Sequence, residues 1–164
     1  MTPSLKPRAA APAAALGFLL VWFTSSPLSA QVTPPEQAAK VLSAPHLLTS
    51  DGGLVLNFIK PDRTADFEAV VAKLKEALKK SPKPERQKQA ASWKVYKSPE
   101  AGPGGSMVYV FTMEPAVKGV DYTVSAILSE AFPADAIALY KQYSEAYASG
   151  YNFLNLSLVQ DLGK

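Results

Sequence analysis

Residues Met107–Met113 read MVYVFTM, a seven-residue run with apolar side chains at both alternating sets of positions. Successive residues of a strand point to opposite faces of its sheet, so this strand is apolar on both faces. Strands of that kind lie inside a sheet and are covered on both sides. We therefore predict a central, covered strand here, with Phe111 in the core.

A hairpin loop and an edge strand are predicted just before this run. Pro99–Ser106 (PEAGPGGS) is rich in proline and glycine, which is typical of a loop between two strands. Ser92–Lys97 (SWKVYK) alternates apolar and polar side chains, as a half-buried strand does. Its lysines favour a place at the edge of the sheet, because charged side chains discourage pairing between sheets.

The first strand and the first helix are predicted further upstream. Leu54–Lys60 (LVLNFIK) has strand-type composition and ends before Pro61. Thr64 can cap a helix that ends at Ser81, because the apolar residues between them follow helical spacing. Those residues are Phe67, Val70, Val71, Leu74 and Leu78. The hydrophilic segment Lys83–Ala91 predicts a polar connection to the edge strand.

Two helices and a last strand are predicted downstream of the central strand. An insertion from Lys118 contains a short helix at Val124–Ala131, and a second main helix runs from Pro133 to Gly150. We expect the buried side of that main helix to consist of Ile137, Tyr140, Tyr143 and Tyr147. Asn152–Gln160 (NFLNLSLVQ) places three leucines on one face of a fourth strand.

The resulting order β-α-β-β-α-β predicts the α+β class and a ferredoxin-like sandwich. We expect a four-stranded antiparallel sheet with two main helices on one face and a short extra helix before the second main helix. This domain spans residues 54–160. Residues 31–53 form a lead-in outside the core, with a possible short helix after Thr33.

The first 30 residues have the layout of a secretory signal peptide. Lys6 and Arg8 precede the apolar run Ala9–Phe23, and the small residue Ala30 precedes Gln31. A membrane-spanning helix needs about 20 apolar residues, and this run is shorter. We therefore expect residues 1–30 to be removed, which leaves no integral membrane segment and a protein in the periplasm or outside the cell.

Composition argues against several classes of function. Removing the first 30 of 164 residues leaves 134 and lowers the formal net charge from +3 to +1, because that segment holds two basic and no acidic residues. Nucleic-acid-binding domains usually carry a concentrated basic face, so we expect no nucleic-acid partner. The chain contains no cysteine and one histidine, His46. We expect no metal, no cofactor and no thiolate chemistry.

The element order from Leu54 to Val159 resembles the dimeric α/β-barrel branch of the ferredoxin-like proteins. That branch includes small cofactor-free monooxygenases and haem-degrading enzymes. In the haem-degrading relatives an Asn on the first strand, a Trp and a His act together. Here Asn57 and Trp93 lie on the first two strands, but His46 precedes the first strand. The segment Lys118–Pro133 (KGVDYTVSAILSEAFP) is also similar to small exported bacterial proteins with no assigned activity.

The pleat of the first strand separates two sets of residues. The larger set is expected to pack on the helices and consists of Leu54, Leu56 and Phe58. The opposite side of the sheet would then form a face for a ligand or a partner. The candidate residues on that face are Val55, Asn57, Ile59, Trp93 and Tyr109.

Two functions fit these residues. The first is an exported, non-catalytic binding domain that uses the open face of its sheet, with a homodimer as the expected state and a small apolar ligand as a further option. The second is a cofactor-free, monooxygenase-like enzyme that acts on a small aromatic substrate, with Asn57, Trp93 and Tyr109 lining its site. An enclosed cavity beside Asn57 would distinguish the enzyme from the binding domain.

Overall fold

Four antiparallel strands form an open sheet in the computed structural model, which describes residues 45–163. The strands are β1 (Gly52–Ile59), β2 (Trp93–Ala101), β3 (Met107–Met113) and β4 (Tyr147–Leu156). They lie in the order β2-β3-β1-β4, so β3 is an interior strand, as its sequence predicted. The predicted cover on both of its faces is wrong for the described residues, because the helices lie over only one of them. The predicted signal peptide, residues 1–30, and the possible helix after Thr33 lie outside the described residues.

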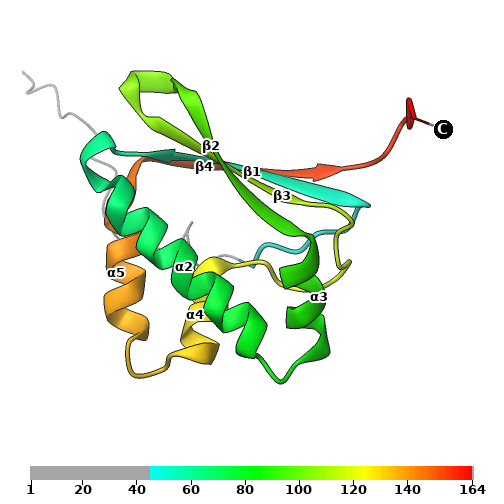
Figure 1. Cartoon of the computed structure of the whole chain (residues 1–164), viewed down its shortest axis with the longest axis horizontal. Helices are drawn as coiled ribbons and strands as arrows, with labels where there is room; N and C mark the ends of the chain where they lie inside the picture. The colour runs from blue at the N-terminus through cyan, green and yellow to red at the C-terminus, as the bar shows by residue number, and fades with distance from the viewer. Residues whose placement is uncertain (1–44, 164) are drawn as a thin grey trace, which may run out of the picture. The chain divides into compact units, whose positions relative to one another are not determined.

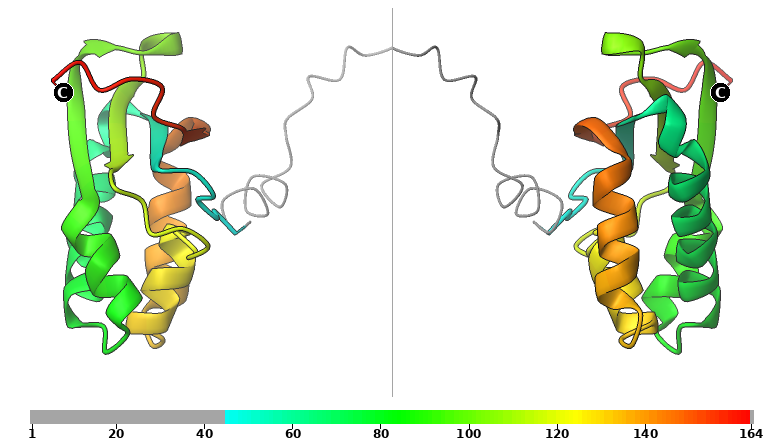
Figure 2. Two further views of the ribbon diagram at one scale, coloured as in Figure 1. Left: turned by 90° about the vertical axis from the view of Figure 1, so that its right-hand side faces the viewer. Right: turned by 90° about the vertical axis from the view of Figure 1, so that its left-hand side faces the viewer.

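The four α-helices of the described chain all lie on one side of this sheet (Figures 1 and 2). They are α2 (Thr64–Lys80), α3 (Pro84–Ser92), α4 (Val124–Ala131) and α5 (Ala136–Ala146). The α+β class and the antiparallel sheet are thereby confirmed. None of the helices within residues 45–163 is long and apolar enough to cross a membrane.

The helix α3 corrects the prediction of a polar connection at Lys83–Ala91. Pro84 starts the helix, and its fixed backbone angle suits a first helical position. The buried side of α3 consists of the polar residues Arg86, Gln89 and Ser92. Hydrophobic periodicity therefore gives no sign of this helix.

The boundary between α5 and β4 also differs from the prediction. The helix ends at Ala146, and β4 begins at the next residue, because the carbonyl oxygen of Ala146 accepts a hydrogen bond from the Lys60 backbone N–H (2.9 Å) and Tyr147 pairs with Ile59. The buried side of α5 consists of Leu139, Tyr143 and Ala146. Ile137 lies on the opposite side of the helix and is 87% exposed, so its predicted burial is wrong.

The two faces of β1 are the reverse of those predicted. Val55, Asn57 and Ile59 are buried beneath the helices, whereas Leu54, Leu56 and Phe58 are half-buried on the uncovered side. The helices place large rings, those of Phe67 and Tyr143, over the sheet. The smaller residues of β1 therefore fit on this side. The Phe67 ring of α2 lies at its centre, with ring centroids 4.8–6.0 Å from those of Tyr109, Phe111, Tyr143 and Tyr147.

Part of the predicted lead-in also belongs to the core. Leu48 is fully buried, and its side chain occupies the space where a Cβ of Gly53 would be, 2.5 Å away. The backbone of this segment bonds to the loop before α4, with Gly119 N–H donating to Leu48 O and Tyr122 N–H donating to His46 O (both 2.9 Å). Residues 46–48 are therefore a structural part of the domain.

Replacement of Phe111 tests the assignment of the core. Phe111 is 1% exposed, so Phe111→Ala is expected to lower the free energy of unfolding by about 3–5 kcal/mol, through lost burial and the cavity left behind. Denaturant titration measures this change. The control Ile137→Ala, at an exposed helical site, should stay within about 0.5 kcal/mol of the unaltered protein. Equal effects of the two substitutions would contradict the assignment.

Candidate binding sites

All five residues predicted for a ligand or partner face lie on the helix-covered side of the sheet. The register pairs Asn57 with Tyr109 and Trp93 with Met113, which is fully buried beneath the helices. The structure thus brings Val55, Asn57, Ile59, Trp93 and Tyr109 to one face, but that face is not the open one. Their role in binding a ligand stays a prediction.

Asn57 is a buried amide with every polar atom in a hydrogen bond. Its Nδ2 donates to the carbonyl oxygens of Tyr109 (3.1 Å) and Val55 (3.4 Å), and its Oδ1 accepts from the Tyr147 hydroxyl (2.7 Å). The hydroxyls of Tyr147 and Tyr143 lie 2.6 Å apart. Because the single Tyr147 proton goes to Asn57, the Tyr143 hydroxyl supplies the proton between the two tyrosines. Burial raises the pKa of both tyrosines, so they stay neutral.

The empty space beside Asn57 is small. Its volume is about 10 Å³, between Asn57, Tyr143 and Tyr151. A water molecule needs about 10–15 Å³ of such space, and an aromatic substrate needs far more. The buried network therefore acts as a polar part of the core and offers no room for a substrate.

His46 packs against β4, on residues next to this network. Its Nε2 lies 2.6 Å from the Tyr151 hydroxyl, and its ring stacks on Phe153 with centroids 4.9 Å apart. Burial lowers the pKa of His46, and the nearby Asp121 carboxylate opposes this only in part. The imidazole is therefore held in its neutral form.

The uncovered side of the sheet, which we call the open face, is mostly apolar. Figure 1 shows no helix on this side. The strand register places these side chains on the open face: Leu54, Leu56, Phe58, Lys94, Tyr96, Val108, Val110, Thr112, Asn152, Leu154 and Leu156. Lys94, on the edge strand β2, is the charged residue of this set.

The C-terminal segment extends the open face beyond the end of the sheet. It leaves β4 on the side away from the helices (Figure 1). A hollow of about 540 Å³ lies between this segment and the sheet, with Leu54 and Leu156 on one side and Leu158 and Leu162 on the other. Val159 and Leu162 are 96% and 93% exposed, so the segment presents apolar side chains to solvent.

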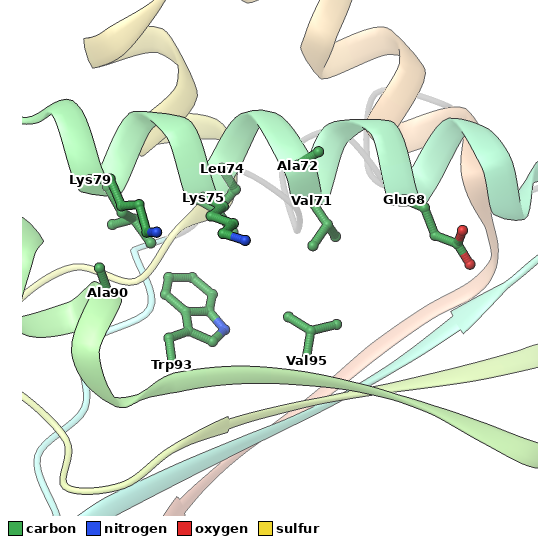
Figure 3. Close-up of a pocket in the computed structure, with 10 residues that line it drawn as sticks. Glu68, Val71, Ala72, Leu74, Lys75, Lys79, Ala90, Trp93 and Val95 are labelled. Carbon is green, nitrogen blue, oxygen red and sulfur yellow. The ribbon is translucent and has the colours of Figure 1, made fainter.

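A second hollow, which we call the α2–β2 groove, lies on the helix side. It has a volume of about 420 Å³ and runs between α2 and the edge strand β2 (Figure 3). Val71 of α2 and Val95 of β2 face each other across it, and Trp93 closes one end. The groove is mostly apolar, with charged side chains at its rim.

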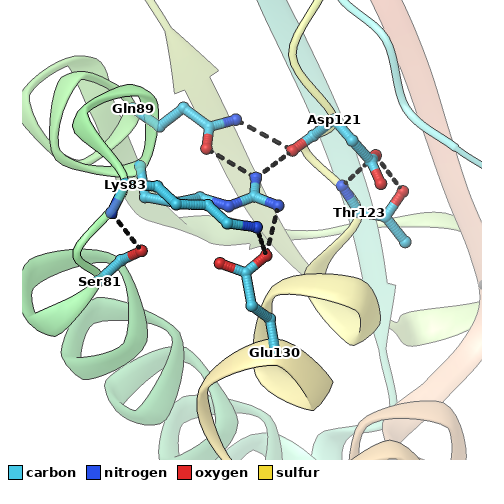
Figure 4. A network of polar contacts seen from close by, with 7 residues as sticks. Ser81, Lys83, Gln89, Asp121, Thr123 and Glu130 are labelled. Carbon is cyan, nitrogen blue, oxygen red and sulfur yellow. Dashed lines mark hydrogen bonds and ion pairs between the residues drawn. The ribbon is translucent and has the colours of Figure 1, made fainter.

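A buried arginine of α3 lies at the centre of a network of polar contacts (Figure 4). Arg86 Nη1 donates to the backbone carbonyl of Asp121 (2.6 Å) and to Gln89 Oε1 (2.9 Å), while Nη2 pairs with Glu130 (3.2 Å). Gln89 Nε2 donates to the same Asp121 carbonyl (3.1 Å). These contacts tie α3 to α4 and to the loop before it, and they fix the start of β2 at Trp93.

Sequence reasoning missed both the groove and the true residues of the open face. The sequence shows the apolar and cationic residues of α2, but it does not show the distance between α2 and β2, on which the groove depends. Within residues 45–163, no three His, Asp or Glu side chains lie close enough together to hold a metal ion. Comparisons with protein-family models, curated protein sequences and solved structures gave no match.

A charge at position 57 tests the buried network. Asn57→Asp is expected to lower the free energy of unfolding by about 3–5 kcal/mol at pH 7, because burial raises the pKa of a carboxyl by about 3 units or more. The new oxygen would also face the carbonyls of Val55 and Tyr109. Denaturant titration at several pH values measures this cost.

The pH dependence of this variant has a defined sign. A raised folded-state pKa penalises the charged form, so the loss of stability should shrink as the pH falls from 7 toward the unfolded value near 4. The control is Asn155→Asp, which keeps the oxygen that accepts the Thr49 backbone N–H (2.8 Å) at an exposed site. A cost at position 57 no larger than at position 155 would show that Asn57 is not buried in solution.

His46 gives a second test that depends on pH. The chain has one histidine, so NMR should show one imidazole titration, with a pKa below the ordinary 6.5. The unfolded state then binds a proton before the folded state does, and stability should fall as the pH is lowered from 7 through 6.5 toward the folded pKa. His46→Gln should lack this fall. A pKa above 6.5 would contradict the packing on Phe153 and Tyr151.

Proposed function

We propose that this chain is an exported, non-catalytic binding domain that associates with a second copy of itself through the open face. One observation carries the proposal: all four α-helices of the described chain cover one side of the sheet, while the other side is mostly apolar and has no helix over it within the described residues. Continuous exposed apolar surfaces on soluble proteins commonly mark interaction sites.

The sheet alone is too small for a stable interface, so the proposed contact includes the C-terminal segment beside it. Four strands of about seven residues cover about 440 Å² in projection, from the usual strand spacing and rise. A stable interface buries about 800 Å² on each partner. The exposed leucines of the C-terminal segment, Leu158 and Leu162, lie beside the open face and add to the apolar area.

The lack of charge at the centre of the open face points the same way. Its centre consists of Leu56, Phe58, Val108 and Val110, without a charged neighbour on the paired strands. Such a surface gives no electrostatic reason to prefer a charged partner. It is complementary to itself in a two-fold arrangement, which is the commonest symmetry of homo-oligomers.

The finer fold assignment is part of the same proposal. The order β2-β3-β1-β4 and the connections through α2 and α5 support a ferredoxin-like sandwich, to which α3 and α4 are added. The resemblance to the dimeric α/β-barrel proteins also supports association into dimers. The layout of residues 1–30 supports export, and the absence of cysteine means that the exported domain relies on its core alone.

The alternative function, a cofactor-free monooxygenase, requires a substrate cavity beside Asn57. The space there is about 10 Å³, and Asn57 already makes its hydrogen bonds within the protein. The binding domain therefore has the better support.

A charge at the centre of the open face tests the proposal. Leu56→Lys is expected to weaken self-association at least about a hundredfold, because the ammonium group would be buried without a partner. Tyr96→Lys should act in the same direction, at a position that is 52% exposed and therefore tolerant of the change. Sedimentation equilibrium of the exported protein, with its start at Gln31 verified by intact mass, measures the association.

The matched control introduces the same charge on the other side of the molecule. Ile137→Lys places a lysine at an exposed apolar residue of α5 and should leave association unchanged. The proposal fails if the unaltered protein is monomeric at every concentration, or if lysine at position 137 disrupts association as strongly as lysine at position 56.

A further inference from the structure

The α2–β2 groove has the size and the lining of a site for a small molecule. Its volume of about 420 Å³ falls within the range of about 300–1,000 Å³ that is typical of ligand pockets. Val71, Leu74, Ala90, Trp93 and Val95 form most of its wall. The Trp93 ring is held from behind by Phe111 and Tyr122, with centroids 5.7 and 5.3 Å away, so this wall is rigid.

The charges at the rim differ between the two ends of the groove. The Glu68 end is neutralised within the protein, because the carboxylate pairs with Lys97 (3.0 Å) and accepts a hydrogen bond from the Tyr109 hydroxyl. At the other end, the amino groups of Lys75 and Lys79 point from α2 toward the groove above Trp93 (Figure 3).

These two lysines also differ from the other lysines of α2. Lys73 and Lys80 both pair with Glu76, at 3.2 and 2.7 Å. Lys75 and Lys79 make no ion pair with any residue of the described chain. They are four residues apart on the helix, where two like charges repel each other. An anion between them would relieve this repulsion.

We infer that the α2–β2 groove binds a small amphipathic anion, a carboxylate with a medium-length hydrocarbon chain. The carboxylate lies between Lys75 and Lys79, and the hydrocarbon chain lies between Val71 and Val95, against Trp93. About 10 Å of groove separates the level of Lys75 from that of Glu68, seven residues away on α2. This site lies on the helix side of the sheet and is independent of association through the open face.

Titration of the full chain with decanoate tests the inference. Calorimetry measures the affinity, and the NMR signal of the Trp93 indole N–H, assigned with Trp93→Phe, reports whether decanoate enters the groove. Decyltrimethylammonium, a cation with a hydrocarbon chain of equal length, serves as the comparison. We expect decanoate to bind and to move the Trp93 signal, and the cation to leave that signal in place.

Charge variants of α2 provide the matched control. The double variant Lys75→Gln with Lys79→Gln should weaken decanoate binding at least about tenfold, because two charged donors are lost. Lys73→Gln with Lys80→Gln removes the same charge from the same helix and should change binding less than about twofold.

Four results would overturn the inference. The first is an unmoved Trp93 signal with decanoate, and the second is an equal response to the cation. The third is equal weakening by the two double variants. A change of oligomeric state caused by the Lys75 and Lys79 replacements would also overturn it, and would assign the groove to a second copy of the chain. Sedimentation of these variants separates that outcome from a failure of the open-face proposal.

Discussion

All four α-helices of the described chain pack on one side of a four-stranded sheet. The packing between helices and sheet determines which strand residues are buried. Phe67, Tyr143 and Tyr147 fill the layer between helices and sheet with large rings. The strand β1 contributes the smaller residues Val55, Asn57 and Ile59 to that side, which leaves its larger residues to the other side. Within residues 45–163, the apolar side chains on the open face of the sheet therefore have no helix over them.

The sequence locates those elements whose buried sides are apolar. The helices α2 and α4 lie where they are predicted, because apolar spacing marks both. Thr64, however, is the first residue of α2 and not its cap, since the N-cap position is Arg63. Alternation also shows that Val55, Asn57 and Ile59 share a face. It does not tell which face the helices cover, because both sets of β1 side chains are hydrophobic enough to be buried. That choice depends on the bulk of side chains that arrive from other elements.

Elements whose buried sides are polar cannot be predicted from apolar spacing. Arg86 and Gln89 are buried because the Asp121 carbonyl and Glu130 satisfy them, and these partners are 30 or more residues away in the sequence. Asn57 is buried for the same reason, since Tyr147 donates to it from the first residue of β4. These buried polar groups find hydrogen-bond partners in only one arrangement of the chain. They therefore define the register of β1 and the position of α3 more sharply than apolar packing alone would.

The position of β1 between β3 and β4 has a consequence for how the chain folds. Gly52 pairs with Leu156, near the end of the described chain, while Ile59 pairs with both Met107 and Tyr147. Contacts so distant in sequence raise the contact order and slow folding. While the C-terminal part is still being synthesised, one side of β1 has no strand to pair with. The sheet can therefore be completed only after β4 has been synthesised, and until then β1 lacks the partner strand on that side.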